Sequence, residues 1–210
     1  TPVPAGADAM EHLLQADPVL GEIVAAHGGL DDGERARARP AEAYGALLRS
    51  IVGQQLSTKA ARTIYGRLTE LYDGAPPTPE QLLATDPDDL RGVGLSRAKG
   101  TYLRSLAEHV VSGELQLERL ADLPDDEVSA QLTAVKGLGQ WTADMFLIFH
   151  LRRPDVLPVG DLGIRRAVQV AYGLEELPAK ARLEEIAEPW RPYRSLACLY
   201  LWRSLDNEPA

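Results

Sequence analysis

Apolar residues recur every three or four positions along most of this chain, which is the spacing of a helix that buries one face. Residues 140–151 and 162–171 show this spacing most clearly. Alternation of apolar and polar residues, which is typical of strands, is almost absent. The pattern therefore predicts an all-α fold of about ten helices joined by short loops.

Capping residues predict where several of these helices begin. Serine and threonine hydroxyls and aspartate carboxylates accept hydrogen bonds from the first N–H groups of a helix, and proline is favoured in its first turn. Such signals precede apolar runs at Ser57-Thr58, Thr78-Pro79, Asp86-Pro87, Ser96 and Pro124-Asp125. We therefore expect helices to start at these points.

Two glycine turns separate helical runs, Gly92-Val93-Gly94 and Gly137-Leu138-Gly139. Glycine reaches backbone angles closed to other residues and lets a bulky anion approach the main chain. The second turn leads directly into the run at 140–151, so it precedes unpaired N–H groups and the positive end of a helix. With Lys136 beside it, this turn is a predicted phosphate site. A plain corner between two helices explains the glycines alone equally well.

A carboxylate, Asp161, follows this helix after a loop that ends in Pro158-Val159-Gly160. It stands at the start of the run 162–171, where an N-cap role is common for aspartate. Of two nearby acids, we expect Asp144 on the helix surface and Asp155 in the loop. Asp161 is the candidate catalytic group, and capping and catalysis are compatible roles.

The composition limits the class of protein. With 210 residues and 45% hydrophobic content, the chain can form one large or two small domains. No apolar run approaches the about 20 residues needed to span a bilayer, and the N-terminus lacks the order of a signal peptide. The single cysteine, Cys198, cannot form an internal disulfide, so we expect a cytoplasmic protein.

The net charge of −9 argues against DNA binding unless the basic residues gather on one face. Acidic residues crowd the segments 86–89, 122–127 and 175–188. This separation from the basic residues is compatible with a modest, salt-sensitive affinity for DNA. The basic residues in or near the motifs are Lys59, Arg62, Arg97, Lys99, Lys136, Arg165 and Arg166.

The glycine turn and the aspartate loop together resemble a known family. The segments V-K-G-L-G-Q-W-T-A-D (135–144) and L-P-V-G-D-L-G-I-R-R (157–166) are similar to the helix-hairpin-helix DNA glycosylases, and within them to 3-methyladenine DNA glycosylase II (AlkA type). The likeness spans roughly residues 41–205. Three further segments agree: I-V-G-Q-Q-L-S (51–57), G-V-G-L-S-R-A-K (92–99) and W-R-P-Y-R-S-L-A (190–197).

The resemblance implies two helical domains with a DNA cleft between them. A central helical barrel of residues 41–153 would carry the helix-hairpin-helix motif, and residues 1–40 together with 154–210 would form a bundle. The AlkA type carries an extra N-terminal β domain, for which this sequence shows no match. Some substrate and DNA contacts of that type are therefore not carried over.

The activity implied by the resemblance is that of a DNA-3-methyladenine glycosylase in base excision repair. Such an enzyme flips an alkylated base, such as 3-methyladenine or 7-methylguanine, out of duplex DNA and hydrolyses its N-glycosidic bond. A fixed carboxylate, here Asp161, stabilises the cationic sugar as the base leaves. The alkylated purine already carries positive charge and needs no acid to protonate it. Relatives that also cut the backbone use a lysine where this chain has Trp141, which implies a monofunctional enzyme.

The resemblance also assigns residues to the base and to the DNA. Trp141 and Trp202 would line an aromatic pocket for a cationic base, and Met145 stands where the AlkA type has a tyrosine. Core packing is the alternative for all three. Gln55 is the predicted wedge that replaces the flipped nucleotide, with Leu56 as the alternate. The alternative is that Leu56 packs in the core and the glutamines belong to the start of a helix. The predicted DNA contacts are Gln55, Leu56, Ser57, Arg97, Lys99, Lys136, Gly137, Leu138, Gly139, Gln140 and Thr142.

No cofactor is required by this reading. An iron–sulfur cluster needs four cysteines, and the chain has one. Family members hold a monovalent cation at the hairpin, which implies a structural K+ or Na+ on the main-chain carbonyls of Thr133, Val135 and Leu138.

The predicted partners are double-stranded DNA with damaged bases and an abasic-site endonuclease that takes over the product. We expect a monomer associated with the nucleoid and not with a membrane. Two alternatives stay open. A non-catalytic helix-hairpin-helix DNA-binding module would explain the glycines but not Asp161 or the tryptophan pair. A glycosylase for deaminated or oxidised bases would need a hydrogen-bonding partner for a neutral leaving group, and His150 is the histidine beside the motif.

Overall fold

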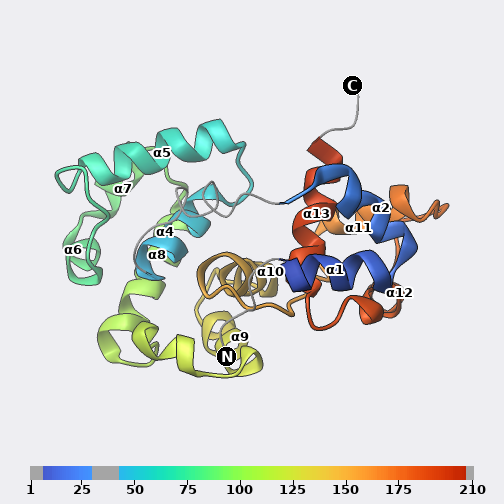
Figure 1. Ribbon diagram of the computed structural model, residues 1–210. Helices are drawn as coiled ribbons and strands as arrows, with labels where there is room; N and C mark the ends of the chain where they lie inside the picture. The colour runs from blue at the N-terminus through green and yellow to red at the C-terminus, as the bar shows by residue number, and fades with distance from the viewer. Residues whose placement is uncertain (1–6, 30–42, 207–210) are drawn as a thin grey trace. The chain divides into compact units, whose positions relative to one another are not determined.

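Helices form every regular element in the part of the chain that the structure describes (Figure 1). The computed structural model describes residues 7–29 and 43–206. The prediction of an all-α fold is confirmed, and no helix in these ranges is long and apolar enough to cross a membrane. The α-helices are α1 (Ala7–Ala16), α2 (Pro18–His27), α4 (Ala43–Gly53), α5 (Thr58–Glu70), α6 (Pro79–Ala84), α7 (Pro87–Gly92), α8 (Arg97–Ser112), α9 (Asp125–Ala134), α10 (Gln140–Met145), α11 (Leu162–Ala171), α12 (Lys180–Ala187) and α13 (Arg194–Asp206). Shorter elements are the 3-10 helices η1 (Leu117–Asp122) and η3 (Glu188–Trp190) and the π-helical turn η2 (Phe146–His150).

The predicted helix starts at Ser57, Thr78, Asp86 and Ser96 are confirmed. Each of these side chains accepts a hydrogen bond from a main-chain N–H group in the first turn of the helix that follows. At Thr78 the bond belongs to a reciprocal capping box. Helix α9 also begins at the predicted point, Asp125, without a side-chain cap.

The chain divides into two compact units. The central unit comprises Arg39–Phe146, and the terminal unit combines Thr1–Ala38 with Leu147–Ala210. The resemblance implies a central domain that ends at residue 153, whereas this division falls after Phe146. The residues that follow are tied to the terminal unit, since the ring of Phe149 stacks on Trp202 with centroids 5.7 Å apart.

The core of the central unit is built around α8. Leu103 and Leu106 of this helix are fully buried, and α8 packs against α4, α6 and α7. From α4, Leu47 and Leu48 are buried as well. Each buried leucine contributes about 2 kcal/mol of hydrophobic stabilisation, so α8 provides a rigid base for the loops at its ends.

The core of the terminal unit surrounds two large aromatic side chains, Trp190 and Tyr200, which are fully buried. Leu13 of α1, Leu20 of α2 and Ile164 of α11 belong to the same cluster. Helices α2 and α11 both pack against α13. Segments from the two ends of the chain therefore share one hydrophobic core.

One buried carboxylate, Asp17, links three segments of the terminal unit. Its Oδ1 accepts hydrogen bonds from the N–H groups of Val19 at 2.9 Å and Leu20 at 3.2 Å, which caps α2. Its Oδ2 accepts from Trp190 Nε1 at 3.0 Å and from the hydroxyl of Tyr172. Burial, followed by the bond to Asp17, raises the pKa of Tyr172, so this hydroxyl stays protonated and donates.

We predict that Asp17→Ala lowers the free energy of unfolding by about 3 kcal/mol, because α2 loses its cap and the buried indole of Trp190 and the half-buried hydroxyl of Tyr172 lose their acceptor. Urea denaturation followed by circular dichroism measures the loss. Asp86→Ala is the control, since Asp86 caps α7 from an exposed position, where removal of a cap costs about 1 kcal/mol. Equal losses in the two variants would contradict the linking role of Asp17.

Candidate functional site

The predicted glycine turn is a tight hairpin between α9 and α10. The N–H group of Leu138 donates to the carbonyl of Val135 at 3.1 Å, which closes the turn. Gly137 has a φ of 91°, a conformation that favours glycine. Gly139 is exposed and forms the N-cap of α10, where no side chain bonds to the first N–H groups. The hairpin thus presents a helix start without a side-chain cap, as predicted for an anion site.

The two glycines of the hairpin differ in what surrounds them. A Cβ atom at position 137 would lie 2.2 Å from Cγ of Tyr102, so the tyrosine ring fills the place that a side chain would take. Tyr102 belongs to α8. At Gly139 no atom lies within 4 Å of a built Cβ. Gly137 is therefore required by packing, whereas Gly139 leaves open space beside the start of α10.

The loop after α4 is fastened to this hairpin and to α8. Gln54 donates through Nε2 to the carbonyl of Gly137 at 2.7 Å. Lys99 donates through Nζ to the carbonyl of Val52 at 2.8 Å, and desolvation lowers the pKa of its ammonium group. Lys99, predicted to contact DNA, is thus engaged within the central unit. The hydrogen bond from Gln54 to Gly137 was not predicted from the sequence. The position of Gln54 within the matched segment I-V-G-Q-Q-L-S was the feature that could have indicated it.

The two candidate wedge residues are exposed on the same loop. Gln55 has a φ of 56°, which is uncommon for a residue other than glycine, and Leu56 is 37% exposed. Ser57 caps α5 by accepting a hydrogen bond from the N–H group of Ala60 at 3.3 Å. An unfavourable backbone conformation persists where its surroundings fix it, and the bond from Gln54 and the cap at Ser57 hold both sides of Gln55.

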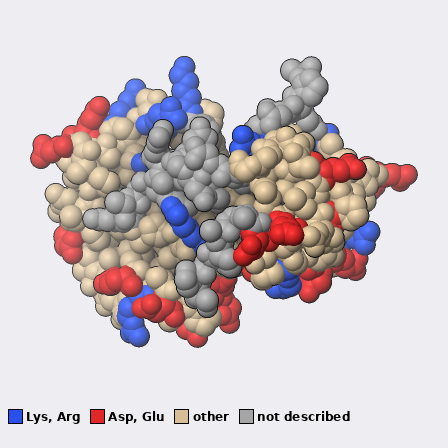
Figure 2. Space-filling model, viewed as in Figure 1, with Lys and Arg blue, Asp and Glu red and all other residues tan. Residues whose placement is uncertain are grey.

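The predicted DNA contacts differ in exposure, and two of them, Lys99 and Gly137, are half-buried. Leu138 and Thr142 are each 4% exposed, so their side chains pack inside the central unit and only their main chain could meet a backbone. The predicted contact of Leu138 and Thr142 with DNA would therefore be made by their main-chain groups, and it stays a prediction. Figure 2 shows Lys and Arg side chains over α5. The exposed members of the predicted set are Gln55, Leu56, Ser57, Arg97, Lys136, Gly139 and Gln140.

The predicted pocket residues of the central unit differ in exposure. Trp141 is 48% exposed, and Met145 is half-buried. A tryptophan that served core packing alone would be largely buried. The exposure of Trp141 therefore favours a surface role, and Met145 fits either of the roles considered for it.

Asp144 is buried, and the prediction that places it on the helix surface is wrong. It is 7% exposed because α10 packs against α9. Gln140 donates through Nε2 to Asp144 Oδ1 at 2.8 Å and lies 3.4 Å from the hydroxyl of Ser129 in α9. Desolvation raises the pKa of Asp144, and the hydrogen bond from Gln140 offsets part of this increase.

In the terminal unit, Asp161 caps α11 and is held by an indole. Its Oδ1 accepts hydrogen bonds from the N–H group of Ile164 at 2.8 Å and from Trp202 Nε1 at 2.9 Å. The N–H group of Asp161 donates to the carbonyl of Pro158 at 2.9 Å. The predicted N-cap role is confirmed. The residue is buried, with 8% of its surface exposed, and the two hydrogen bonds to Oδ1 fix the orientation of its carboxylate.

Trp202 contacts Asp161 with its edge and Phe149 with its face. The stacked rings of Trp202 and Phe149 meet at an interplanar angle of 28°. Gly163 leaves the space for this arrangement, because a Cβ there would lie 3.0 Å from Asp161 Oδ1 and 3.1 Å from Trp202 Nε1. The indole that the resemblance assigns to a base pocket therefore also positions the candidate catalytic carboxylate.

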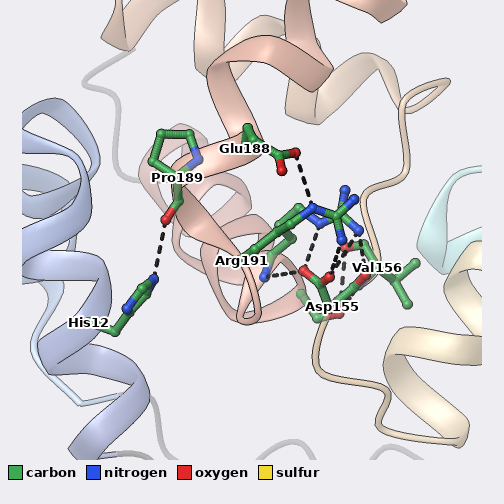
Figure 3. A network of polar contacts seen from close by, with 8 residues as sticks. His12, Asp155, Val156, Glu188, Pro189 and Arg191 are labelled. Carbon is green, nitrogen blue, oxygen red and sulfur yellow. Dashed lines mark hydrogen bonds and ion pairs between the residues drawn. The ribbon is translucent and has the colours of Figure 1, made fainter.

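The loop before Asp161 is bound to the start of α13 (Figure 3). Asp155, a loop residue as predicted, forms ion pairs with Arg191 at 2.6 Å and Arg194 at 2.7 Å. The N–H group of Val156 donates to Ser195 Oγ at 2.9 Å. The binding of this loop by the W-R-P-Y-R-S segment was not predicted from the sequence. Its position within a matched segment was the feature that could have indicated these contacts.

The predicted cation site consists of main-chain carbonyls. No group of three or more His, Cys, Asp or Glu side chains that could hold a metal ion occurs within 7–29 and 43–206. Thr133 lies in the last turn of α9, where carbonyl oxygens have no partner within the helix, and the carbonyl of Val135 accepts the Leu138 N–H group. These oxygens fit a hard monovalent ion. The K+ or Na+ site stays a prediction.

The comparisons with known proteins agree with this geometry. The family model described as HhH-GPD superfamily base excision DNA repair protein matches residues 48–192. The chain is 37% identical over 165 residues to DNA-3-methyladenine glycosylase 1 of Schizosaccharomyces pombe, and the match covers 78% of this chain and 72% of that protein.

Two solved structures share the fold along nearly the whole chain. One is the S. pombe 3-methyladenine DNA glycosylase in complex with abasic DNA, with a TM-score of 0.83 and 33% identity over 95% of this chain and 97% of that one. The other is the DNA-3-methyladenine glycosidase of Bacillus halodurans, with a TM-score of 0.84 and 38% identity over 98% of this chain and 92% of that one.

We predict that Gly137→Ala destabilises the central unit by about 3 kcal/mol, because the new Cβ meets the ring of Tyr102 and φ is left-handed. Gly139→Ala is the matched control, and its effect should stay within about 0.5 kcal/mol, since the space there is open. Urea denaturation of both variants measures the difference. Comparable destabilisation at the two positions would refute the packing role of Gly137.

We predict that Asp144→Asn gains stability over the wild type as the pH rises from about 4 to about 7. The pKa of Asp144 is raised above the ordinary 3.8, so its carboxyl group keeps its proton to a higher pH in the folded state than in the unfolded state. Its contribution to stability therefore falls as the pH passes through the raised pKa, whereas asparagine still accepts from Gln140 and does not ionise. Denaturation at several pH values measures the effect, with Asp126→Asn at an exposed position of α9 as the control. An advantage that does not change with pH would reject this account.

Proposed function

This chain belongs to the HhH-GPD superfamily of base excision DNA repair proteins, and on that basis we propose that it is a monofunctional DNA glycosylase for alkylated bases in duplex DNA. The reaction is hydrolysis of the N-glycosidic bond of bases such as 3-methyladenine and 7-methylguanine. The observation that carries the proposal is the buried carboxylate of Asp161, held by the indole of Trp202 after a matched loop.

The role of Asp161 is to stabilise the positive charge that develops on the deoxyribose during the reaction. As the base leaves, the deoxyribose becomes cationic, and a carboxylate that is already oriented stabilises this charge without reorganisation. Two donors, the N–H group of Ile164 and the indole N–H group of Trp202, fix Oδ1 before substrate arrives. The alkylated base leaves with its own positive charge neutralised, so one carboxylate is sufficient for this substrate class.

The hairpin is the proposed site for the DNA backbone. The first N–H groups of α10 have no side-chain cap, and the exposed Gly139 leaves room for a phosphate beside them. Lys136, also exposed, adds a positive charge next to the turn. The hydrogen bond from Gln54 to the carbonyl of Gly137 and the ring of Tyr102 packed against Gly137 hold the backbone of the turn in place before DNA binds.

The loop at Gln55 and Leu56 is the proposed wedge. A flipped nucleotide leaves a gap in the base stack, and an inserted side chain keeps the gap from closing. The left-handed backbone at Gln55 turns the loop sharply, and Leu56 offers an exposed apolar side chain next to it. Trp141 would then stack on the displaced cationic base, which is worth about 0.5 to 2 kcal/mol for a cation over an aromatic face.

Double-stranded DNA with damaged bases is the partner that this activity needs, and an abasic-site endonuclease would take over the product. We propose that the protein acts as a monomer in the compartment that holds the DNA. A K+ or Na+ ion on the carbonyls of Thr133, Val135 and Leu138 would stiffen the hairpin, and no redox cofactor takes part.

We predict that Asp161→Asn slows base release by roughly 10² to 10³-fold, while its affinity for DNA changes by less than about twofold. Asparagine keeps the cap of α11 and the acceptor for Trp202 but lacks the charge. The measurement is single-turnover release of 3-methyladenine from methylated duplex DNA, with strand breaks scored before and after alkali. Asp86→Asn is the matched control, since Asp86 is another helix-capping aspartate.

Each outcome of that experiment has a distinct meaning. Release by the wild type with breaks only after alkali supports a monofunctional glycosylase. Breaks before alkali would refute the monofunctional assignment. DNA binding without release of any methylated base would reject the proposal in favour of a binding module or of a glycosylase for deaminated or oxidised bases.

A further inference from the structure

The loop of residues 151–160 is held by a charged contact at its middle (Figure 3). Arg194, the first residue of α13, donates through Nε to Asp155 Oδ1 at 2.7 Å and through one terminal nitrogen to Oδ2 at 3.1 Å. The same nitrogen donates to the main-chain carbonyl of Asp155 at 2.9 Å. The side chain of Arg194 is 14% exposed and that of Asp155 is 24% exposed, so water screens this pair only in part. A forked contact of this kind fixes distance and orientation together.

The main chain of the loop is held at the same place. The N–H group of Ser195 donates to the carbonyl of Pro154 at 3.0 Å, and Ser195 Oγ accepts from the N–H group of Val156 at 2.9 Å. Ser195 is 5% exposed. Residues 154–156 are therefore joined to residues 194 and 195 by side-chain and main-chain bonds, which leaves little freedom at this point of the loop.

Helix α13 connects this contact to the candidate catalytic carboxylate. Trp202 lies eight residues after Arg194 on the same helix, which corresponds to about 12 Å of helix rise. Its indole N–H group donates to Asp161, six residues after Asp155 in the loop. The loop is thus attached to one helix at two points, through Asp155 at its middle and through Asp161 at its end. A shift at the first attachment moves the carboxylate relative to the indole at the second.

We propose that Asp155 and Arg194 are positioning residues for Asp161. Their forked contact sets where the loop enters α11 and keeps the carboxylate of Asp161 within hydrogen-bonding distance of Trp202 Nε1. Neither residue needs to touch DNA for this role. The inference rests on the proposed function of Asp161, but the positioning of the carboxylate can be measured without activity.

The kinetic test compares Asp155→Ala with the wild type under single-turnover conditions on methylated duplex DNA. We expect the rate of base release to fall about tenfold while the dissociation constant for the same DNA changes less than about twofold, since a small displacement of a catalytic group acts on the chemical step. Asp155→Glu keeps the charge and should recover part of the rate. Glu185→Gln is the matched control, because it removes an exposed ion pair with Arg182 in the same unit.

The structural test uses the indole N–H resonances of the three tryptophans in ¹H–¹⁵N spectra. Trp202 is assigned by Trp202→Phe. Trp190 serves as the internal reference, because its indole bonds to the buried Asp17 in the core of the same unit. In Asp155→Ala and in Arg194→Lys we expect the Trp202 resonance to move while the Trp190 resonance stays in place.

The two readouts separate positioning from general stability. A shifted Trp202 resonance with a slower release and unchanged DNA affinity supports the proposal. It is overturned if the Trp202 resonance and the rate match the wild type in both variants, or if the Trp190 and Trp202 resonances change together. A wild type that releases no base would reject the proposed function of Asp161, and the indole resonances would still decide whether the contact positions the carboxylate.

Discussion

A buried carboxylate is stable only where hydrogen-bond donors replace the water around it. This constraint determines how the helices of the terminal unit are held together. Asp17 satisfies it with two main-chain N–H groups, the hydroxyl of Tyr172 and the indole of Trp190. Asp161 satisfies it with the N–H group of Ile164 and the indole of Trp202. In both cases a tryptophan from the C-terminal part of the chain donates to an aspartate that caps a helix. Each carboxylate therefore fixes how the capped helix packs against the elements from which its donors come.

Several energetically unfavourable features of the central unit lie around its hairpin. Gln55 has a left-handed backbone, Gly137 presses against an aromatic ring, and the buried Asp144 has a raised pKa because one amide offsets only part of its desolvation. Such features cluster where a fold is constrained by more than its own stability. Their gathering near the hairpin, apart from the leucine-rich core around α8, fits a region shaped for binding.

Local features of the fold were predictable because they depend on adjacent residues. The caps at Ser57, Thr78 and Asp161 each follow from one side chain and the helix beside it. The burial of Asp144 could not be predicted, because it depends on the packing of α10 against α9. The contact of Arg194 with Asp155 joins segments 39 residues apart, and no spacing within either segment selects the partner. The resemblance identified the segments but not which of their side chains hold one another.

The contact between Gly137 and Tyr102 also restricts how this sequence can change over time. The tyrosine ring occupies the volume in which any side chain at position 137 would begin. A substitution at 137 is compatible with this fold only after position 102 has become smaller, and the left-handed φ at 137 must then be relieved as well. A smaller residue at 102 leaves a gap behind the hairpin until 137 fills it. Position 102 must therefore change first, and the protein with only that change is less well packed. We expect the residues at positions 102 and 137 to vary together among related sequences.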